Sequence, residues 1–285
     1  MQLFDFFRKK FTKHQQKRSF KEYGYKIISF DIDEDSIGKV DYAQWLHPFD
    51  ALKSVTKENV RFFKNLVHRG DLVIDIGAHE GDTTVPMALA AGKEGLVIAL
   101  EPNRYVYKIL EKNASLNKKH TNIVPLCFAA TVEDGEFIFN YSDASFCNGG
   151  FLSQIKNKKS GHNYTLKIKG INLEHYLLTN YKDDLNRLKL IKVDAEGYDR
   201  EILKSISKII TDFKPNLIFE CYKRLVLEER NQLFDLIAGF GYDLFFLDNF
   251  EQDCKMEKIE KKDMMKRKHF DIIAIHRAFP LNLKG

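Results

Sequence analysis

The chain has 285 residues, of which 44% are hydrophobic and 30% charged, so it can bury a full core and is not a disordered protein. Residues 1–25 hold seven Lys/Arg and two Asp/Glu, and this excess accounts for the formal net charge of +5, because 38 of each sign remain in the rest of the chain. A balanced body lacks the broad basic face that phosphate contacts require, which argues against a nucleic-acid substrate.

Cysteine usage and hydropathy indicate the compartment. The four cysteines are widely separated and form no C-x-x-C pair, a pattern typical of free thiols in a reducing environment. No apolar run approaches the roughly 18 residues that a membrane span needs, and no signal-peptide pattern is present. We therefore expect a cytoplasmic protein.

The N-terminal stretch, residues 1–21, places phenylalanines among Lys and Arg side chains. As a helix it is amphipathic and basic, and it either packs its apolar face on the body, which we favour, or contacts an anionic membrane surface or a partner. Residues 23–54 alternate short β-like runs with turn residues and contain the only tryptophan, Trp45. The sequence predicts a basic arm and cap over residues 1–55, followed by a main domain over residues 56–285.

The main domain alternates predicted helices and strands. Helices are predicted at residues 56–68, 82–91, 102–117 (with Pro102 in the first turn), 198–210 and 225–238. Strands are predicted at residues 72–76, 95–100, 122–126, 188–193, 216–220, 242–247 and 270–275. Residues 131–180 interrupt this alternation with two β-like runs around a polar loop, which predicts an inserted hairpin. The alternation indicates a mostly parallel sheet covered by helices on both faces.

The end of the first strand carries the first candidate site. It finishes in Asp75 and opens into a turn containing Gly77 and Gly81. Glycine allows close backbone approach to a ligand, and the following helix start offers free N–H groups. Glu101 closes the second strand, a position where an acid hydrogen-bonds a ribose diol. The turn contains neither G-x-G-x-x-G nor the Gly-Lys-Ser/Thr of a P-loop, so a cofactor with a ribose but no pyrophosphate is favoured.

Two further strands also end in carboxylates. Asp194 and Glu196 follow the fourth strand in an Asp-Ala-Glu-Gly segment, and Glu220 closes the fifth. In open α/β sheets the ligand lies outside the carboxyl ends of the strands, where these side chains are expected to meet.

Three motifs in this order carry a family resemblance. They are Asp-Ile-Gly-Ala-His-Glu-Gly at residues 75–81, Glu-Pro-Asn at residues 101–103 and Ile-Lys-Val-Asp-Ala-Glu-Gly-Tyr-Asp at residues 191–199. The chain resembles the FkbM family of S-adenosylmethionine-dependent methyltransferases over about residues 56–250. The resemblance implies a Rossmann-like class I methyltransferase fold, α/β, with a seven-stranded, mostly parallel sheet whose last strand is antiparallel. It also implies S-adenosylmethionine as cofactor and O-methylation of a hydroxyl on a sugar, glycan or secondary metabolite.

The resemblance also implies site residues. Those on the cofactor side are Asp75, Gly77, His79 and Gly81 around the methionine and ribose, Glu101 at the ribose hydroxyls with Asn103 beside it, and Ala129 near the adenine. Asp194 and Glu196 are implied beside the transferred methyl group, with Asp194 as base or substrate orienter. Glu196 has an equal alternative, in which it bonds backbone N–H groups of its own turn.

His79 is the least settled residue of the turn, because family members commonly carry Asn there. It is a second base candidate, since imidazole titrates near neutrality, but we favour a histidine that satisfies a local backbone carbonyl.

Several alternatives stay open. Glu220 can join Asp194 and Glu196 in a divalent-metal site, but acidic strand ends also serve cofactor and substrate without one, so no metal is expected. A nicotinamide-dependent nucleotide-sugar oxidoreductase would use Glu101 equally well. A cofactor-binding scaffold without catalysis is the third possibility. The methyl acceptor is not encoded in any motif.

Overall fold

The computed structural model describes residues 15–147, 149–152 and 164–280. Its largest sheet contains the strands β3 Leu72–Ile76, β4 Leu96–Leu100, β5 Ile123–Leu126, β10 Leu188–Val193, β11 Asn216–Cys221, β12 Tyr242–Leu247, β13 Met256–Lys258 and β14 Phe270–His276. The helices are α2 Lys57–Lys64, α3 Thr84–Ala91, α4 Arg104–Ser115, α5 Leu173–Asn180, α6 Asp199–Ser205, α7 Ser207–Phe213 and α8 Leu227–Gly239.

The sheet order is β13-β12-β14-β11-β10-β3-β4-β5. The strands β5, β4, β3, β10 and β11 run parallel, whereas β14 is antiparallel to both β11 and β12. This confirms the expected Rossmann-like α/β sheet with an antiparallel last strand. The sheet of the described residues has eight strands instead of seven, because β13 pairs with the edge of β12. A three-residue strand in a charged connector has no alternation that sequence could reveal.

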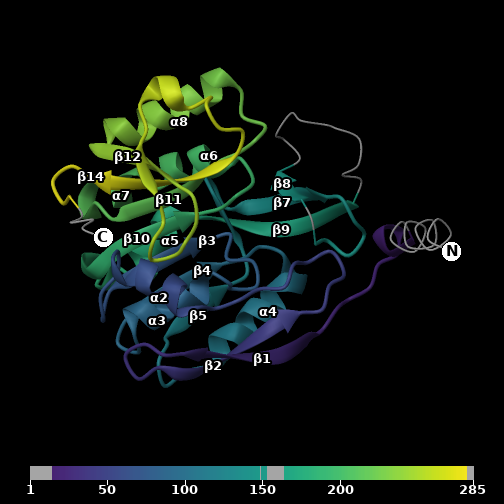
Figure 1. Cartoon of the computed structure of the whole chain (residues 1–285). Helices are drawn as coiled ribbons and strands as arrows, with labels where there is room; N and C mark the ends of the chain where they lie inside the picture. Colours follow the sequence, from purple (N-terminus) through teal and green to yellow (C-terminus); the bar gives the residue numbers. More distant parts are fainter. Residues whose placement is uncertain (1–14, 148, 153–163, 281–285) are drawn as a thin grey trace, which may run out of the picture.

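Helices cover both faces of this sheet, as Figure 1 shows. Alternate residues of a strand point to opposite faces. Thus Ile191 of β10 packs in the core with Leu203 of α6 and Leu233 of α8, whereas Leu190 packs in a second core with Phe63 of α2 and Met87 of α3. No helix in the described part of the chain is long and apolar enough to span a bilayer.

The five predicted helices all differ from the observed ones in their boundaries, and for two of them the structure shows the cause. The helix α4 begins at Arg104, because the side chain of Asn103 accepts a hydrogen bond from the backbone N–H of Tyr105 and caps it, so Pro102 lies before the first turn. The helix predicted over residues 198–210 is divided into α6 and α7 at Ile206, whose backbone leaves the helical conformation.

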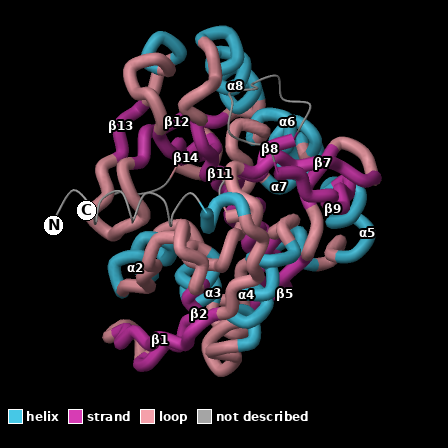
Figure 2. The backbone as a smooth tube through the Cα atoms, turned by 90° about the vertical axis from the view of Figure 1, so that its right-hand side faces the viewer, coloured by secondary structure: helices cyan, strands magenta, loops and turns pink. Residues whose placement is uncertain are grey.

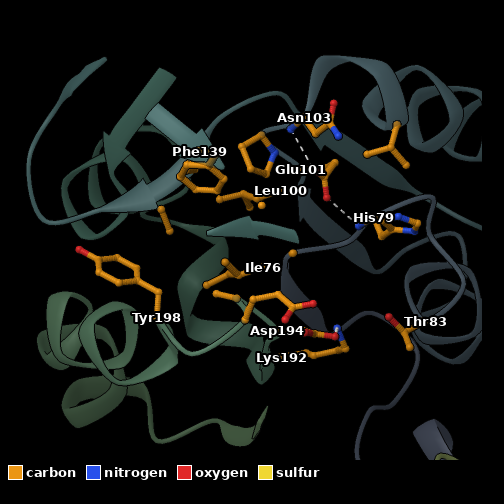
Figure 3. Close-up of a pocket in the computed structure, with 18 of the residues that line it drawn as sticks. Ile76, His79, Thr83, Leu100, Glu101, Asn103, Phe139, Lys192, Asp194 and Tyr198 are labelled. Atoms are coloured by element: carbon orange, nitrogen blue, oxygen red, sulfur yellow. Dashed lines mark hydrogen bonds and ion pairs between the residues drawn. The ribbon is translucent and has the colours of Figure 1, made fainter. Parts of the chain in front are cut away.

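The insertion is more than the predicted hairpin. Its described residues form a four-stranded sheet, in the order β6-β9-β7-β8, from β6 Ala129–Thr131, β7 Gly135–Tyr141, β8 Gly149–Leu152 and β9 Tyr164–Asn172. The antiparallel pair of β7 and β9 is the hairpin that the sequence predicted. The strand β6 adds a parallel neighbour, and α5 completes the segment. In Figures 1 and 2 the strands β7, β8 and β9 lie together at one side of the main sheet.

The cap is an antiparallel pair of β1 Tyr25–Ile32 and β2 Gly38–Trp45. Asn113 of α4 attaches it to the body: the amide oxygen accepts from the backbone N–H of Ala43 at 2.7 Å, and the amide nitrogen donates to the carbonyl of Ala43 at 3.1 Å and of Glu80 at 2.7 Å. The amphipathic helix expected over residues 1–21 falls mainly on residues 1–14, outside the described residues, and its role stays a prediction.

Candidate active site

A cavity of about 530 Å³ opens at the carboxyl edge of the main sheet, a volume typical of small-molecule sites. Three parts of the chain line it. The strand ends contribute Ile76, Gly77, Leu100, Glu101, Lys192 and Asp194; the cap contributes Phe49, Asp50, Ala51 and Lys53; and the insertion contributes Phe139, Tyr141, Gly150 and Leu152. Residues 120 or more positions apart in the sequence therefore share one cavity.

The glycine turn is held against the end of β10. Gly77 has a φ of +82°, and a Cβ there would lie 2.0 Å from the backbone oxygen of Asp194. Only glycine permits both this conformation and this approach. Asp75 is fully buried behind the turn, where its carboxylate accepts from the Thr84 hydroxyl at 2.6 Å and pairs with the Lys192 ammonium at 3.4 Å.

Glu101 is the best-defined carboxylate of the site. Its Oε1 accepts from the backbone N–H of Asn103 at 2.8 Å, and its Oε2 accepts from the backbone N–H of His79 at 3.0 Å. Burial raises the pKa of Glu101 to about 7, against the opposing effect of these two hydrogen bonds. Each carboxylate oxygen retains acceptor capacity for a ligand.

The structure places the remaining cofactor-side candidates in two groups. Ala129, at the start of β6, lines the cavity, and so does Asn103, although its amide already caps α4 and donates to the carbonyl of Phe146 at 2.7 Å. Asp75 and Gly81 do not line the cavity. Gly81 has a φ of +98°, and its site is tightly packed, with Leu110 3.1 Å from where a Cβ would be. Both residues act on the shape of the turn rather than through cavity contact.

His79 lines the cavity with a φ of 50°. Burial lowers the pKa of its imidazole, and the nearby Lys53 charge lowers it further. Its ring lies 5.9 Å from the Trp45 ring in an edge arrangement. Its backbone N–H, bonded to Glu101, is the contact that the structure assigns most clearly.

The segment after β10 forms the opposite wall. Asp194 is half exposed and lies 3.7 Å from the Lys192 ammonium. Glu196, with a φ of 50°, also lines the cavity; burial raises the pKa of its carboxyl, with Asp194 adding to the effect and a hydrogen bond from Tyr222 opposing it.

Asp199 performs the backbone role that was the alternative for Glu196. Its two carboxylate oxygens accept from the backbone N–H of Gly197 at 3.1 Å and of Glu220 at 3.2 Å. Burial, with help from Asp194, raises the pKa of Asp199 to about 7. The signal available in the sequence was the position of Asp199, a second carboxylate in the Gly-Tyr-Asp run that directly follows Glu196.

The metal hypothesis at Asp194, Glu196 and Glu220 is not supported. Glu220 instead contacts His269, with 2.9 Å between Oε1 and Nε2. Burial and the surrounding acids, Asp194 first, raise the pKa of Glu220 to about 9. Within the described ranges, the group of His, Cys, Asp or Glu ligand atoms that lies within 4.8 Å is a different one: Asp50, His79 and Glu80.

Lys192 is a site residue that sequence reasoning did not assign. It is buried between Asp75 and Asp194, and although burial disfavours its charge, these two carboxylates raise its pKa above the usual value. The signal was a lysine within an otherwise apolar strand, because a buried charge needs partners.

The sheet order, with β14 antiparallel beside β11, is that of a Rossmann-like class I methyltransferase fold. A family model described as Methyltransferase FkbM domain matches residues 75–244, more than half of the chain. The chain belongs to this family of S-adenosylmethionine-dependent methyltransferases. Family membership decides against the oxidoreductase and the scaffold without catalysis.

Solved structures with similar folds are distant in sequence. A precorrin-6y C5,15-methyltransferase from Geobacter metallireducens is 11% identical, with a TM-score of 0.39, over 76% of this chain and 87% of that one. An S-adenosylmethionine-dependent O-methyltransferase from Thermotoga maritima is 12% identical, with a TM-score of 0.39, over 89% and 78%. A methyltransferase FkbM from Methylobacillus flagellatus is 15% identical, with a TM-score of 0.42, over 72% and 43%. No curated relative matches the chain significantly.

Proposed function

We propose that this methyltransferase methylates a hydroxyl oxygen, on a sugar, glycan or secondary metabolite. The observation that carries the proposal is the Asp194 carboxylate, which lines the cavity, is half exposed and stands against the cofactor turn through the close contact of its backbone with Gly77. A half-exposed carboxylate at this position, paired with the Lys192 ammonium on one side only, is an acceptor for a hydroxyl proton.

Bound S-adenosylmethionine supplies a methyl group on a sulfonium. The protein must then align the acceptor oxygen with that methyl group and exclude water. Asp194 orients the hydroxyl and takes its proton, while Lys192 holds the carboxylate in place from behind, 3.7 Å away. Glu196, on the same wall, is a second acceptor for hydroxyl groups of the substrate.

On the cofactor side, we propose that Glu101 binds the ribose hydroxyls and that Ala129 lies near the adenine. The fit is supported by the cavity, which is lined by Glu101, by Ala129 and by the aromatic ring of Phe139 on the insertion. His79 holds Glu101 through its backbone and stays a second base candidate.

The test uses methyl-labelled S-adenosylmethionine with a panel of sugars, glycans and polyketide-type alcohols. Asp194→Asn should lower turnover about 100-fold or more, because the amide cannot take the proton, while affinity for S-adenosylhomocysteine stays within about threefold. Asp212→Asn, at an exposed position on α7, is the matched control. A fully active Asp194→Asn enzyme, or methylation confined to nitrogen or carbon acceptors, would contradict the proposal.

A further inference from the structure

We propose that Lys53 and Asp82 form the subsite for the amino-acid end of S-adenosylmethionine, with Lys53 binding the carboxylate and Asp82 the ammonium group. The proposal rests on the cofactor placement proposed above, with the ribose at Glu101. It adds a role for the cap, because Lys53 lies in the segment that follows β2, outside the domain over which the family model matches.

The geometry of the pair matches a zwitterion. The Lys53 ammonium lies 3.0 Å from Asp82 Oδ2, both residues line the cavity, and their side chains are 21% and 31% exposed. An α-amino acid carries one positive and one negative group on the same carbon atom. A lysine and an aspartate side by side at the cavity wall present the complementary charges, and charge-assisted hydrogen bonds of this kind are strong.

Lys53 is the available cation for a carboxylate. Among the described residues that line the cavity, Lys53 and Lys192 are the only Lys or Arg side chains. Lys192 is buried between two carboxylates, Asp75 at 3.4 Å and Asp194 at 3.7 Å. Within the residues that the structure describes, Lys53 forms an ion pair with Asp82 only, so its ammonium has donors left for a ligand.

The surroundings keep Lys53 charged and in place. Burial disfavours its charge, but Asp82 and Asp50 outweigh this effect and raise its pKa. Its backbone N–H donates to the buried Gln44 side chain at 2.7 Å, which fixes the loop to β2. An ordered cation loses less entropy on binding than a mobile surface lysine.

The pair also lies at the correct end of the cavity. Asp82 directly follows the glycine turn, and Lys53 is close enough to His79 to lower the pKa of its imidazole. The backbone of His79 is bonded to Glu101. The amino-acid end of the cofactor must extend from the ribose past the turn, and the Lys53–Asp82 pair is adjacent to that turn.

The test compares the binding of three probes to the full-length protein by calorimetry. S-adenosylhomocysteine carries both charged groups, decarboxylated S-adenosylmethionine lacks the carboxylate, and methylthioadenosine lacks both groups. Lys53→Gln should weaken S-adenosylhomocysteine at least tenfold, through loss of a charge-assisted hydrogen bond, and leave the other two probes within twofold. Lys53→Arg should restore most of the affinity, and Lys57→Gln, at an exposed lysine on α2, should change none of the three.

The outcomes separate the two proposals. Equal weakening of all three probes by Lys53→Gln, or no weakening of S-adenosylhomocysteine, would overturn the carboxylate role. Glu101→Ala should weaken all three probes, because each carries the ribose. If Glu101→Ala has no effect while Lys53→Gln remains selective, the ribose placement fails and the carboxylate subsite stands.

Discussion

At the scale of single residues, Glu101 shows how backbone geometry prepares a side chain for binding. Each of its carboxylate oxygens accepts one backbone N–H, from Asn103 and from His79, so the group is oriented before any ligand arrives. A fixed carboxylate loses little conformational entropy when a ribose binds. Burial raises the pKa of Glu101 to about 7, so ligand binding at this carboxylate should depend on pH near neutrality.

Cofactor affinity should rise with pH through this range. The ionised carboxylate accepts hydrogen bonds from ribose hydroxyls better than the neutral acid, so binding favours the ionised form and lowers the pKa of Glu101 from about 7. S-adenosylhomocysteine affinity should therefore increase, by about tenfold at most, between about pH 6 and 8.

Calorimetry on Glu101→Gln supplies the control for this prediction. The amide does not titrate, so the variant should bind more weakly and with a flatter pH dependence. An unchanged pH dependence in the variant would assign the effect to another group.

At the scale of elements, the site depends on how closely the glycine turn after β3 meets the end of β10. The two strands are parallel neighbours in register, with Ile76 opposite Val193. The backbone N–H of Asp194 donates to the carbonyl of Ile76 at 2.9 Å, and the Gly77 Cα lies against the Asp194 carbonyl. The glycine turn and the segment that follows β10, which we propose to hold the cofactor and the acceptor, are therefore in direct backbone contact.

Gly77→Ala should destabilise the protein strongly. A Cβ at this position would lie 2.0 Å from the Asp194 oxygen at a φ of +82°. Strain and overpacking together should lower the free energy of unfolding by about 2 to 5 kcal/mol in urea denaturation. Gly38→Ala is the matched control, because Gly38 has a φ of +71° with nothing within 4 Å of its Cβ position, and it should cost only about 1 kcal/mol. Equal losses of unfolding free energy in both variants would show that the close contact with Asp194 does not contribute to the effect.

At the scale of the whole molecule, the fold collects acidic groups at one edge of the sheet. Burial raises the pKa of Glu101 and of Asp199 to about 7, of Glu80 to about 8 and of Glu220 to about 9. These groups ionise near pH 4 in the unfolded chain. From about pH 7 to 9 the folded state therefore binds more protons than the unfolded state, and stability must fall as pH rises.

Thermal denaturation between pH 7 and 9 should show this decline. Glu220→Gln should reduce the slope of the unfolding free energy against pH by about 1 kcal/mol per pH unit, because one retained proton is removed from the folded state. Glu228→Gln, at an exposed position on α8, should leave the slope unchanged. A slope of the same size in Glu220→Gln would show that Glu220 is ionised in the folded protein.

Sequence determined the framework of this protein. The strands β3, β10 and β12 were predicted to the residue, because short apolar runs bounded by charged residues or glycine have few other ways to be buried. The alternation of strands and helices predicted the parallel sheet. Strand-end position indicated Glu101, Asp194 and Glu196, which line the cavity, but also Asp75 and Glu220, which do not. The short strands β6, β8 and β13 escaped prediction, because three or four residues show no periodicity and these lack the apolar, β-branched run that marked β5.

Only the tertiary structure decided which groups meet. Lys53 pairs with Asp82 across 29 positions and Lys192 with Asp75 across 117, and each partner comes from a different element. Sequence shows each charge separately, but whether it is buried, and against which opposite charge, depends on how the cap docks on α4 and how β10 lies beside β3. A charged side chain pairs with whichever opposite charge lies near it in space. The order of residues along the chain does not show that distance until the sheet is assembled.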